Sequence, residues 1–206
     1  MSSGAISREK PESFEAGEFS VLMSVYAGTK TEEFEQAMTS IWDEQVLKPG
    51  EICLVCDGPL AESLEERIRC WKNDLNQSLC IVRLKNNQGL ARALNEGILS
   101  CRYDLIARMD SDDCSVPLRF KLQHDYMIKH ADVAVLGGQV EEWDNAFEKF
   151  IAFRSVPQTH EEILKFSKFR SPVNHPTVMF RRQAVKDAGM YPEYFPEDYC
   201  LWVNML

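Results

Sequence analysis

The feature that most constrains the fold of this 206-residue chain is a fourfold alternation of strand and helix patterns over residues 19–109. Short apolar runs, typical of strands buried on both faces, alternate with stretches in which apolar residues recur every three or four positions. The predicted strands are 19–26, 51–56, 79–84 and 103–109, and the predicted helices span 31–47, about 61 through 71, and the 86–89 turn to 99. This order predicts an α/β fold with a mostly parallel sheet and helices on both faces.

Polar turns follow each of the four predicted strands. They are residues 26–28, 57–58, 86–89 and 110–113. Because ligand sites in open parallel sheets lie beyond the carboxyl ends of the strands, these turns should share one rim. The sequence therefore predicts a pocket at that rim.

The most acidic of these turns carries three carboxylates in four positions, Asp110, Asp112 and Asp113. Their mutual repulsion at the end of a buried strand is unfavourable unless a cation or hydrogen-bond donors compensate it. Carboxylate oxygens suit Mn²⁺ or Mg²⁺, which keep open positions for the phosphates of a substrate. The alternative interpretation is an ordinary surface turn, in which Asp and Ser are common.

Charge and hydropathy exclude several classes of protein. The net charge of −9 argues against a nucleic-acid partner bound through bulk charge, so an anionic ligand must be held locally. No window is long and apolar enough to span a membrane, and residues 1–18 lack the apolar core of a signal peptide. We expect a cytoplasmic protein with a disordered leader over residues 1–18 and one domain over residues 19–206.

The seven cysteines are scattered, which is typical of reduced thiols used as small core residues. Cys53 and Cys56 form a C-x2-C pattern, but they lie on a predicted strand. Side chains three positions apart on a strand point to opposite faces, so no zinc site is expected there.

Beyond residue 117 the regular alternation stops. Thr159 and Glu162 have the spacing of a capping box, and two prolines predict a loop over residues 170–176. Glu197 and Asp198 stand at a predicted helix start, where carboxylates also serve as ordinary N-terminal residues. The other predictions are helices over 118–129 and 159–169, strands over 133–136 and 177–180, and extended or irregular chain over 139–156.

Four motifs, taken in order, resemble those of the family 2 inverting glycosyltransferases with the GT-A fold. They are VCDG at 55–58, NxGLAxALNxG at 87–97, MDSDD with its DXD motif at 109–113, and EDxxLW at 197–202. The resemblance covers residues 19–206. NHPTVMF at 174–180 and the lead-in RMD at 108–110 look most like the bacterial enzymes of O-antigen and exopolysaccharide synthesis, including the amylovoran-type branch.

The resemblance implies an activity. It is the metal-dependent transfer of a sugar from a nucleoside diphosphate sugar, by resemblance a UDP-sugar, to a hydroxyl of a saccharide that is lipid-linked. Such an enzyme would be cytoplasmic or peripheral at the inner face of the cell membrane, with Mn²⁺ or Mg²⁺ as its cofactor.

The resemblance also implies roles for single residues in nucleotide-sugar binding. Asp57 would hydrogen-bond the base, Tyr26 would lie near the uracil or ribose, and Asn87 would belong to the same site. Arg92 is a candidate for the base or the diphosphate, with a solvated helix face as its alternative.

The remaining implied roles concern catalysis. Asp110 would contact the ribose or the donor sugar, and Asp112 would be the principal metal ligand, assisted by Asp113. Asp198 would be the general base that takes the proton from the acceptor hydroxyl, and Glu197 would orient the acceptor or the base.

His175 lies between two prolines, and two interpretations stay open for it. It is either a loop residue bonded to backbone or a group that reaches the metal, the diphosphate or the acceptor. A nearby basic and aromatic cluster also has two interpretations, as a docking site for anionic lipid or acceptor pyrophosphate and as an amphipathic helix. Its members are Lys165, Phe166, Lys168, Phe169, Arg170, Arg181 and Arg182.

Three other functions compete with transferase activity. Members of the family usually continue with further helices, so we expect the chain to be truncated at its C-terminus. The first alternative is therefore a sugar-nucleotide binding module that lacks turnover. A nucleotidyltransferase should carry a Gly-rich basic loop after its first strand, of which residues 26–30 hold only a trace. A dinucleotide-binding protein is disfavoured because no G-x-G-x-x-G follows that strand.

Overall fold

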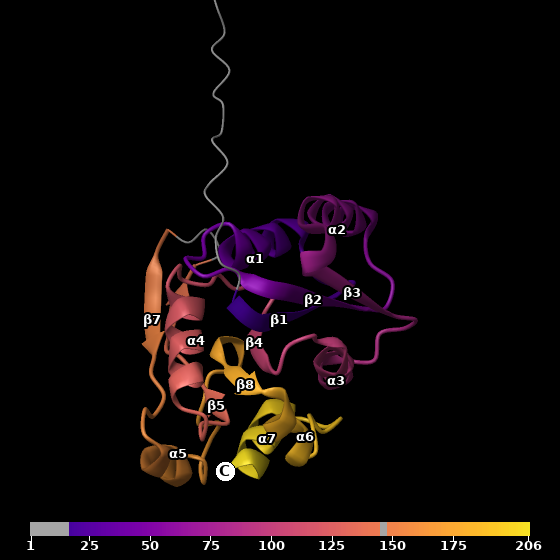
Figure 1. Cartoon of the computed structure of the whole chain (residues 1–206). Coiled ribbons are helices and arrows are strands. Elements are labelled where there is room, and N and C mark those ends of the chain that lie inside the picture. The colour runs from indigo at the N-terminus through magenta and orange to yellow at the C-terminus, as the bar shows by residue number, and fades with distance from the viewer. Residues whose placement is uncertain (1–16, 145–147) are drawn as a thin grey trace, which may run out of the picture.

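The structure, a computed structural model, describes residues 17–144 and 148–206 and is built around one six-stranded sheet (Figure 1). The strand order is β3-β2-β1-β4-β8-β5. Four strands are parallel, as predicted, and β8 runs antiparallel to both of its neighbours. The strands are β1 (Gly17–Tyr26), β2 (Pro49–Asp57), β3 (Leu79–Leu84), β4 (Leu105–Met109), β5 (Val135–Leu136) and β8 (Met179–Arg181).

Helices cover both faces of the sheet, which confirms the predicted layering. On one face α1 (Thr31–Trp42), α2 (Glu62–Leu75) and α4 (Arg119–Lys129) share a buried cluster with side chains such as Val21 and Met23 of β1. The alternate side chain, Leu22, joins the cluster on the opposite face, because successive strand residues point to opposite sides. That face is covered by α3 (Leu90–Ser100), α6 (Arg182–Asp187) and α7 (Glu197–Met205).

Several predicted boundaries differ from the structure. β1 begins at Gly17, so the last two residues of the predicted leader belong to the sheet, while residues 1–16 lie outside the described residues. α1 ends at Trp42, short of the predicted residue 47. Leu90, which lies at the first position of α3, is 38% exposed and lines the pocket, although the helical repeat of this segment predicts that it faces the core with Leu94 and Ile98.

The C-terminal half holds the largest differences. α5 (His160–Phe166) carries the predicted capping box between Thr159 and Glu162 but ends earlier. The short helices η2 (His175–Thr177) and α6 interrupt stretches predicted as loop or left unassigned, and η1 (Asn76–Ser78) extends α2. β6 (Val140–Trp143) and β7 (Phe150–Arg154) pair as a separate antiparallel hairpin.

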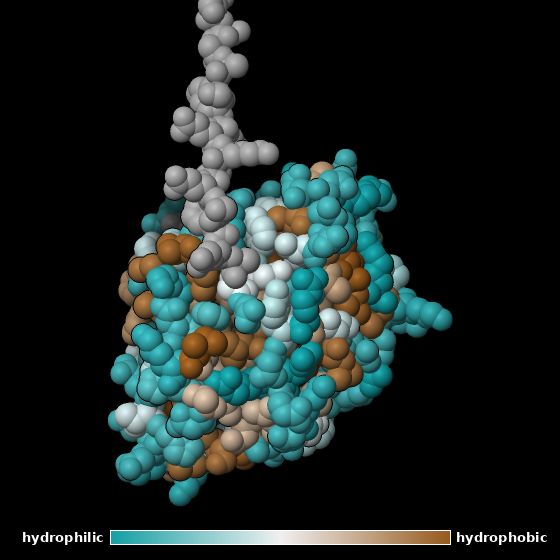
Figure 2. All heavy atoms as spheres, in the orientation of Figure 1, coloured by the Kyte–Doolittle hydropathy of each residue, from teal (hydrophilic) through white to brown (hydrophobic). Residues whose placement is uncertain are grey.

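Hydrophobic residues gather on the outer surface along the edge formed by β7, at the left of Figure 2. Phe150, Ile151 and Phe153 are each about half exposed. Within residues 17–144 and 148–206, no helix is long and apolar enough to cross a membrane. Cys53 and Cys56 pack on opposite faces of the sheet, as predicted, and all seven cysteines are free thiols.

Candidate active site

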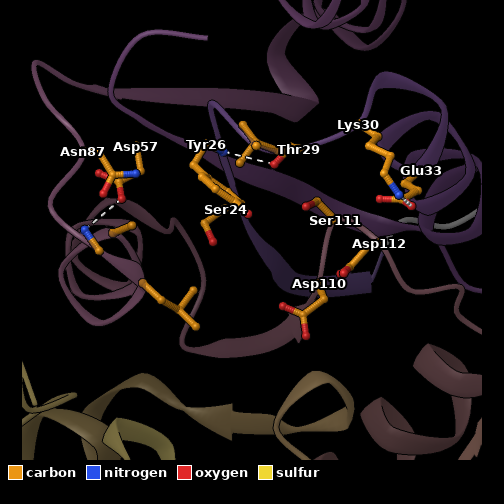
Figure 3. Close-up of a pocket in the computed structure, with 15 residues that line it drawn as sticks. Ser24, Tyr26, Thr29, Lys30, Glu33, Asp57, Asn87, Asp110, Ser111 and Asp112 are labelled. Carbon is orange, nitrogen blue, oxygen red and sulfur yellow. Dashed lines mark hydrogen bonds and ion pairs between the residues drawn. The ribbon is translucent and has the colours of Figure 1, made fainter. Parts of the chain in front are cut away.

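A cavity of about 590 Å³ opens at the carboxyl ends of β1, β2 and β4 (Figure 3). It lies at the switch point of the sheet. The chain continues from β1 to β2 and β3 on one side of β1, and then crosses to β4 on the other side. Five of the predicted site residues line it: Tyr26, Asp57, Asn87, Asp110 and Asp112. Asp57 and Asn87 lie together at one end, and Asp110 and Asp112 lie at the other.

Asp57 ends β2 and braces the turn that precedes α3. Its two carboxylate oxygens accept hydrogen bonds from the backbone N–H groups of Gln88 and Gly89, at 2.7 and 2.9 Å. Gly58, at φ +87°, makes this approach possible because a Cβ there would lie 2.6 Å from the nitrogen of Asn87. Asp57, which the resemblance assigns to binding of the nucleotide base, therefore also holds the loop that lines the cavity in place.

Tyr26 closes β1 and lies over the following turn with 53% of its surface exposed. A Cβ at Gly28 would lie 2.6 Å from its ring, so glycine leaves room for the ring to lie there. The Tyr26 backbone N–H donates to the Thr29 hydroxyl at 3.1 Å, which closes the turn. An exposed aromatic ring in this place is available to a ligand.

A buried arginine, Arg108, and a partly buried one, Arg119, lie beneath the acidic turn, a compensation that the sequence prediction overlooked. Arg108 forms an ion pair with Asp110, and Arg119 donates to the carbonyl oxygen of Arg108 at 2.7 Å. Burial, and then the neighbouring Arg108, lowers the pKa of Arg119. The signal for this arrangement was present, since Arg108, on β4, lies two positions before Asp110, which follows the strand.

Negative charge on the turn nevertheless stays incompletely compensated. Burial raises the pKa of Asp113 to about 6, with repulsion from Asp110 and Asp112 adding to the shift. Burial and then repulsion from Asp110 also raise the pKa of Asp112, which is exposed to the cavity. A cation bound there would relieve this repulsion.

The donor set fits a divalent ion that a ligand helps to hold. Within the described ranges, no three His, Cys, Asp or Glu side chains converge closely enough to hold a metal ion by themselves. Asp112 and Asp113 supply hard carboxylate oxygens, and Mn²⁺ and Mg²⁺ commonly take their remaining ligands from water and substrate phosphates. The two aspartates are thus the residues that would hold such an ion.

Lys30 and Glu33 are cavity residues that sequence reasoning missed. The Lys30 ammonium lies 2.6 Å from the Glu33 carboxylate at the acidic end of the cavity (Figure 3). The hydrogen bond to Glu33 raises the pKa of Lys30. The position of Lys30, one residue before α1 and after a strand-ending turn, was the available signal.

Arg92 does not line this cavity. Its guanidinium pairs with Glu193 and with Glu96, each at 3.1 Å. It lines a second pocket of about 180 Å³ together with Tyr194, Phe195 and the predicted site residue Glu197. Both pockets share Gly89 and Leu90, so they are neighbours across the start of α3.

Glu197 and Asp198 form the first turn of α7 and are half-buried. Burial raises the pKa of the nearby Tyr191, and the charges of Asp198, Asp110 and Glu197 raise it further against the opposing charge of Arg108. The charges of the acidic turn after β4 and of the first turn of α7 thus both act on Tyr191.

The side chain of His175 hydrogen-bonds to another side chain, Tyr191, and not to the backbone. Its Nε2 atom lies 2.8 Å from the hydroxyl oxygen of Tyr191, and its ring packs against Trp202. Burial, followed by the charge of Arg108, lowers its pKa well below the usual value, so it is neutral. Its side chain lines neither the cavity nor the second pocket.

The predicted basic and aromatic cluster divides in the structure. Arg181 and Arg182 donate to the carbonyl oxygens of Met127 and Cys101, at 2.7 and 2.6 Å, and so anchor the chain. On and after α5, Phe169 is 84% exposed, and the basic side chains around it are exposed as well. These are Lys165, Lys168 and Arg170.

The fold and the switch-point cavity define a class, the GT-A nucleotide-sugar transferases. The chain belongs to one family of that class, because residues 20–189 match the family described as Glycosyl transferase family 2. The amylovoran biosynthesis glycosyltransferase AmsE of Erwinia amylovora is 39% identical over 91% of this chain and 69% of its own length. A UDP-Gal:alpha-D-GlcNAc-diphosphoundecaprenol beta-1,3-galactosyltransferase of Escherichia coli is also 39% identical, over 91% of this chain and 67% of its own.

Solved structures share the fold at lower identity. S. aureus TarS 1-349 in complex with UDP-GlcNAc superimposes with a TM-score of 0.69 at 20% identity, over 91% of this chain and 53% of its own. GalNAc-T7 with UDP, GalNAc and Mn²⁺ gives a TM-score of 0.67 at 14% identity, over 92% of this chain and 40% of its own. The chain thus spans between 40% and 53% of the length of these two solved structures.

Proposed function

We propose that this chain transfers a hexose from a UDP-sugar to a hydroxyl of a lipid-linked saccharide, with inversion, in surface polysaccharide synthesis. The observation that carries the proposal is one cavity that joins the turn held by Asp57 to the acidic turn at Asp110 and Asp112. The Escherichia coli relative, named for a UDP-Gal donor and a diphosphoundecaprenol acceptor, supports the choice of substrates.

The donor would lie along the cavity with its base at the Asp57 end. Each oxygen of Asp57 already accepts one backbone hydrogen bond and keeps a further lone pair for a base N–H. The exposed ring of Tyr26 would pack against the base or ribose, and Asn87 lines the same end. The diphosphate would then reach Asp112, beside Lys30.

Asp112, assisted by Asp113, would hold Mn²⁺ or Mg²⁺. The bound ion would supply charge neutralisation for the departing diphosphate. Solved structures of the same fold, named with Mn²⁺ bound, support the use of a divalent ion.

The transfer itself would use Asp198 as general base. Its carboxylate would take the proton of the acceptor hydroxyl as that oxygen bonds to the anomeric carbon. The bond from this carbon to the diphosphate oxygen breaks on the opposite face, which inverts the anomeric centre. Glu197, on the same turn of α7, would orient the acceptor.

The acceptor would enter through the second pocket. Tyr194 and Phe195 line it with 66% and 90% of their surfaces exposed, and Glu197 lies in the same lining. Aromatic faces suit the apolar C–H faces of sugar rings. Arg92 would then face the acceptor side and not the donor base.

We further propose that α5 and residues 167–170 contact the inner face of the membrane that carries the acceptor. Phe169 offers an exposed apolar ring among Lys165, Lys168 and Arg170, a combination that suits anionic lipid headgroups. Binding to vesicles of phosphatidylglycerol, and its loss in Lys165→Glu/Lys168→Glu, tests this contact. Equal binding of both proteins would contradict it.

Calorimetric titration of UDP, GDP and dTDP, each with and without Mn²⁺, tests the donor site. We expect UDP to bind only with Mn²⁺ and Asp112→Ala to abolish the metal-dependent part, while Asp74→Ala, an exposed aspartate on α2, behaves as wild type. Product formation with UDP-galactose and a GlcNAc-diphospho-lipid then tests turnover. Binding of UDP without any product would favour the binding-module alternative, and binding of none of the nucleotides would contradict the proposed function.

A further inference from the structure

Arg108 is a buried cation, and most of its N–H groups have no hydrogen-bond acceptor within the described residues. Only 2% of its surface is exposed, and its Nη2 atom forms the ion pair with Asp110. Its Nε and Nη1 atoms are buried and find no partner within the described residues. The indole N–H of Trp202, on α7, is buried and unpartnered in the same way.

This arrangement does not serve stability. Burying a guanidinium costs free energy that a single ion pair recovers only in part, and every unmade hydrogen bond adds to the cost. The residue two positions earlier, Ile106, is fully buried on the same face of β4 and shows that this core accepts apolar side chains. The function of Arg108 must therefore lie in what it does to Asp110.

The pair has a fixed geometry because strand residues two positions apart point to the same side. Arg108 is the last residue of β4 on the α7 face of the sheet, and Asp110 follows the strand and lines the cavity with 33% of its side chain exposed. His175 and Tyr191, which pack near Arg108, are both neutral at pH 7. Arg108 is the cation that pairs directly with Asp110, whereas Arg119 bonds to the backbone of Arg108.

Asp110 faces the transferred part of the donor. It lies at the opposite end of the cavity from Asp57, and its charge, like that of Asp198, the candidate general base, raises the pKa of Tyr191. In a direct displacement the anomeric carbon must lie next to that base. The sugar, and not the nucleoside, is therefore the part of the donor within reach of Asp110.

We propose that Arg108 is a positioning residue for recognition of the transferred hexose. It holds one oxygen of Asp110, and the other oxygen faces the cavity and accepts a hydroxyl of the sugar. This inference rests on the proposed function and adds to it the residue that orients the sugar-binding carboxylate.

The test compares the binding of UDP with that of a UDP-hexose, in the presence of Mn²⁺, by calorimetry. The probe is UDP-galactose or UDP-GlcNAc, whichever the wild type binds more tightly. We expect Arg108→Met to weaken the UDP-hexose by about tenfold or more and UDP by less than about threefold, as for the loss of one charge-assisted contact to the sugar. Arg108→Lys, which keeps the charge but not the forked donor, should fall between wild type and Arg108→Met.

Arg181→Met is the matched control, because Arg181 is also partly buried and bonds only to backbone carbonyls far from the cavity. It should lower the melting temperature and leave both affinities within about twofold, as for a change remote from the ligand. Equal weakening of UDP and the UDP-hexose by Arg108→Met, or weakening of neither, overturns the positioning role. If Arg108→Met does not fold, Arg108→Lys decides alone, and an unchanged UDP-hexose affinity overturns the role. A wild type that binds neither ligand refutes the proposed function itself.

Discussion

The Nε2 atom of His175 lies 2.8 Å from the hydroxyl oxygen of Tyr191, and the two rings are 5.3 Å apart between centroids. This pair joins the segment before β8 to the segment before α7, and Trp202 of α7 packs on both rings. Both partners are uncharged at neutral pH, because burial lowers the pKa of His175 and raises that of Tyr191. The neutral His175 thus packs with Tyr191 against Trp202 and so helps to hold α7 against the sheet.

Stability should therefore depend on the charge state of His175. Because its pKa is depressed in the fold, its contribution is present above the unfolded value of about 6.5 and is lost as pH falls below it. The slope from this residue approaches about 1.4 kcal/mol per pH unit. Between pH 7.5 and 5, urea unfolding should show a steeper loss of stability with falling pH in wild type than in His175→Gln. His160→Gln, at an exposed position of α5, should keep the wild-type slope, and an equal slope in His175→Gln would contradict the assignment.

Removing the carboxylate of Asp57 should loosen the loop before α3. Asp57→Ala leaves the N–H groups of Gln88 and Gly89 without their acceptor, which should cost about 1–3 kcal/mol of unfolding free energy. Asp57→Asn keeps one acceptor oxygen and should lose less. Urea unfolding measures the stability and calorimetry measures the loss of UDP affinity; a loss of affinity without any loss of stability would show that Asp57 serves the ligand alone.

Asp198→Asn should separate binding from chemistry. Loss of a general base typically lowers the rate by about 10²–10⁴-fold, while the UDP-sugar should bind as before. Single-turnover transfer and calorimetry on the same protein make the comparison. Asn204→Ala, at an exposed position of the same helix, should retain the rate. A retained rate in Asp198→Asn would move the base to Glu197.

Phe195→Ala should act on the acceptor and not on the donor. Loss of an exposed ring from the second pocket should raise the KM of a water-soluble saccharide acceptor by about five- to tenfold, equivalent to about 1–1.4 kcal/mol. The donor KM should stay unchanged. Phe169→Ala removes an equally exposed ring outside this pocket and should leave both values unchanged in solution. A change in donor KM alone would place Phe195 on the donor side.

Gly97→Ala should destabilise the packing of α3 on the sheet. A Cβ at this position would lie 2.2 Å from Cδ1 of Leu22 and 2.8 Å from Cγ2 of Val55. Overpacking of this kind costs about 1–3 kcal/mol. In Gly137→Ala the nearest atom would lie at 3.4 Å, so that variant should unfold close to wild type. Thermal and urea unfolding compare the two, and equal stability would mean that α3 can shift away from the sheet at little cost.

Much of the fold was predictable because its signals are local. The apolar runs that became β1, β2 and β4 and the helical repeats of α1, α2 and α3 lie within single segments. The strands predicted over 133–136 and 177–180 form as β5 and β8, but two and three residues are too few to predict their direction or partners. Their antiparallel pairing with each other, and of β8 with β4, is visible only in the structure. α6 was missed because its six residues begin directly after β8 without a capping signal.

The candidate site, too, has features that local sequence patterns predict and features that only tertiary packing decides. The sequence by itself determined the α/β alternation, the shared rim and the acidic turn, because the strand period and the place of ligands in parallel sheets follow from backbone geometry. Only the tertiary structure decided the partners of single side chains. Arg92 faces Glu193 across 101 positions, Asp57 holds the turn of α3, and His175 meets Tyr191. Such contacts depend on how distant segments pack in three dimensions, and no local pattern encodes that packing.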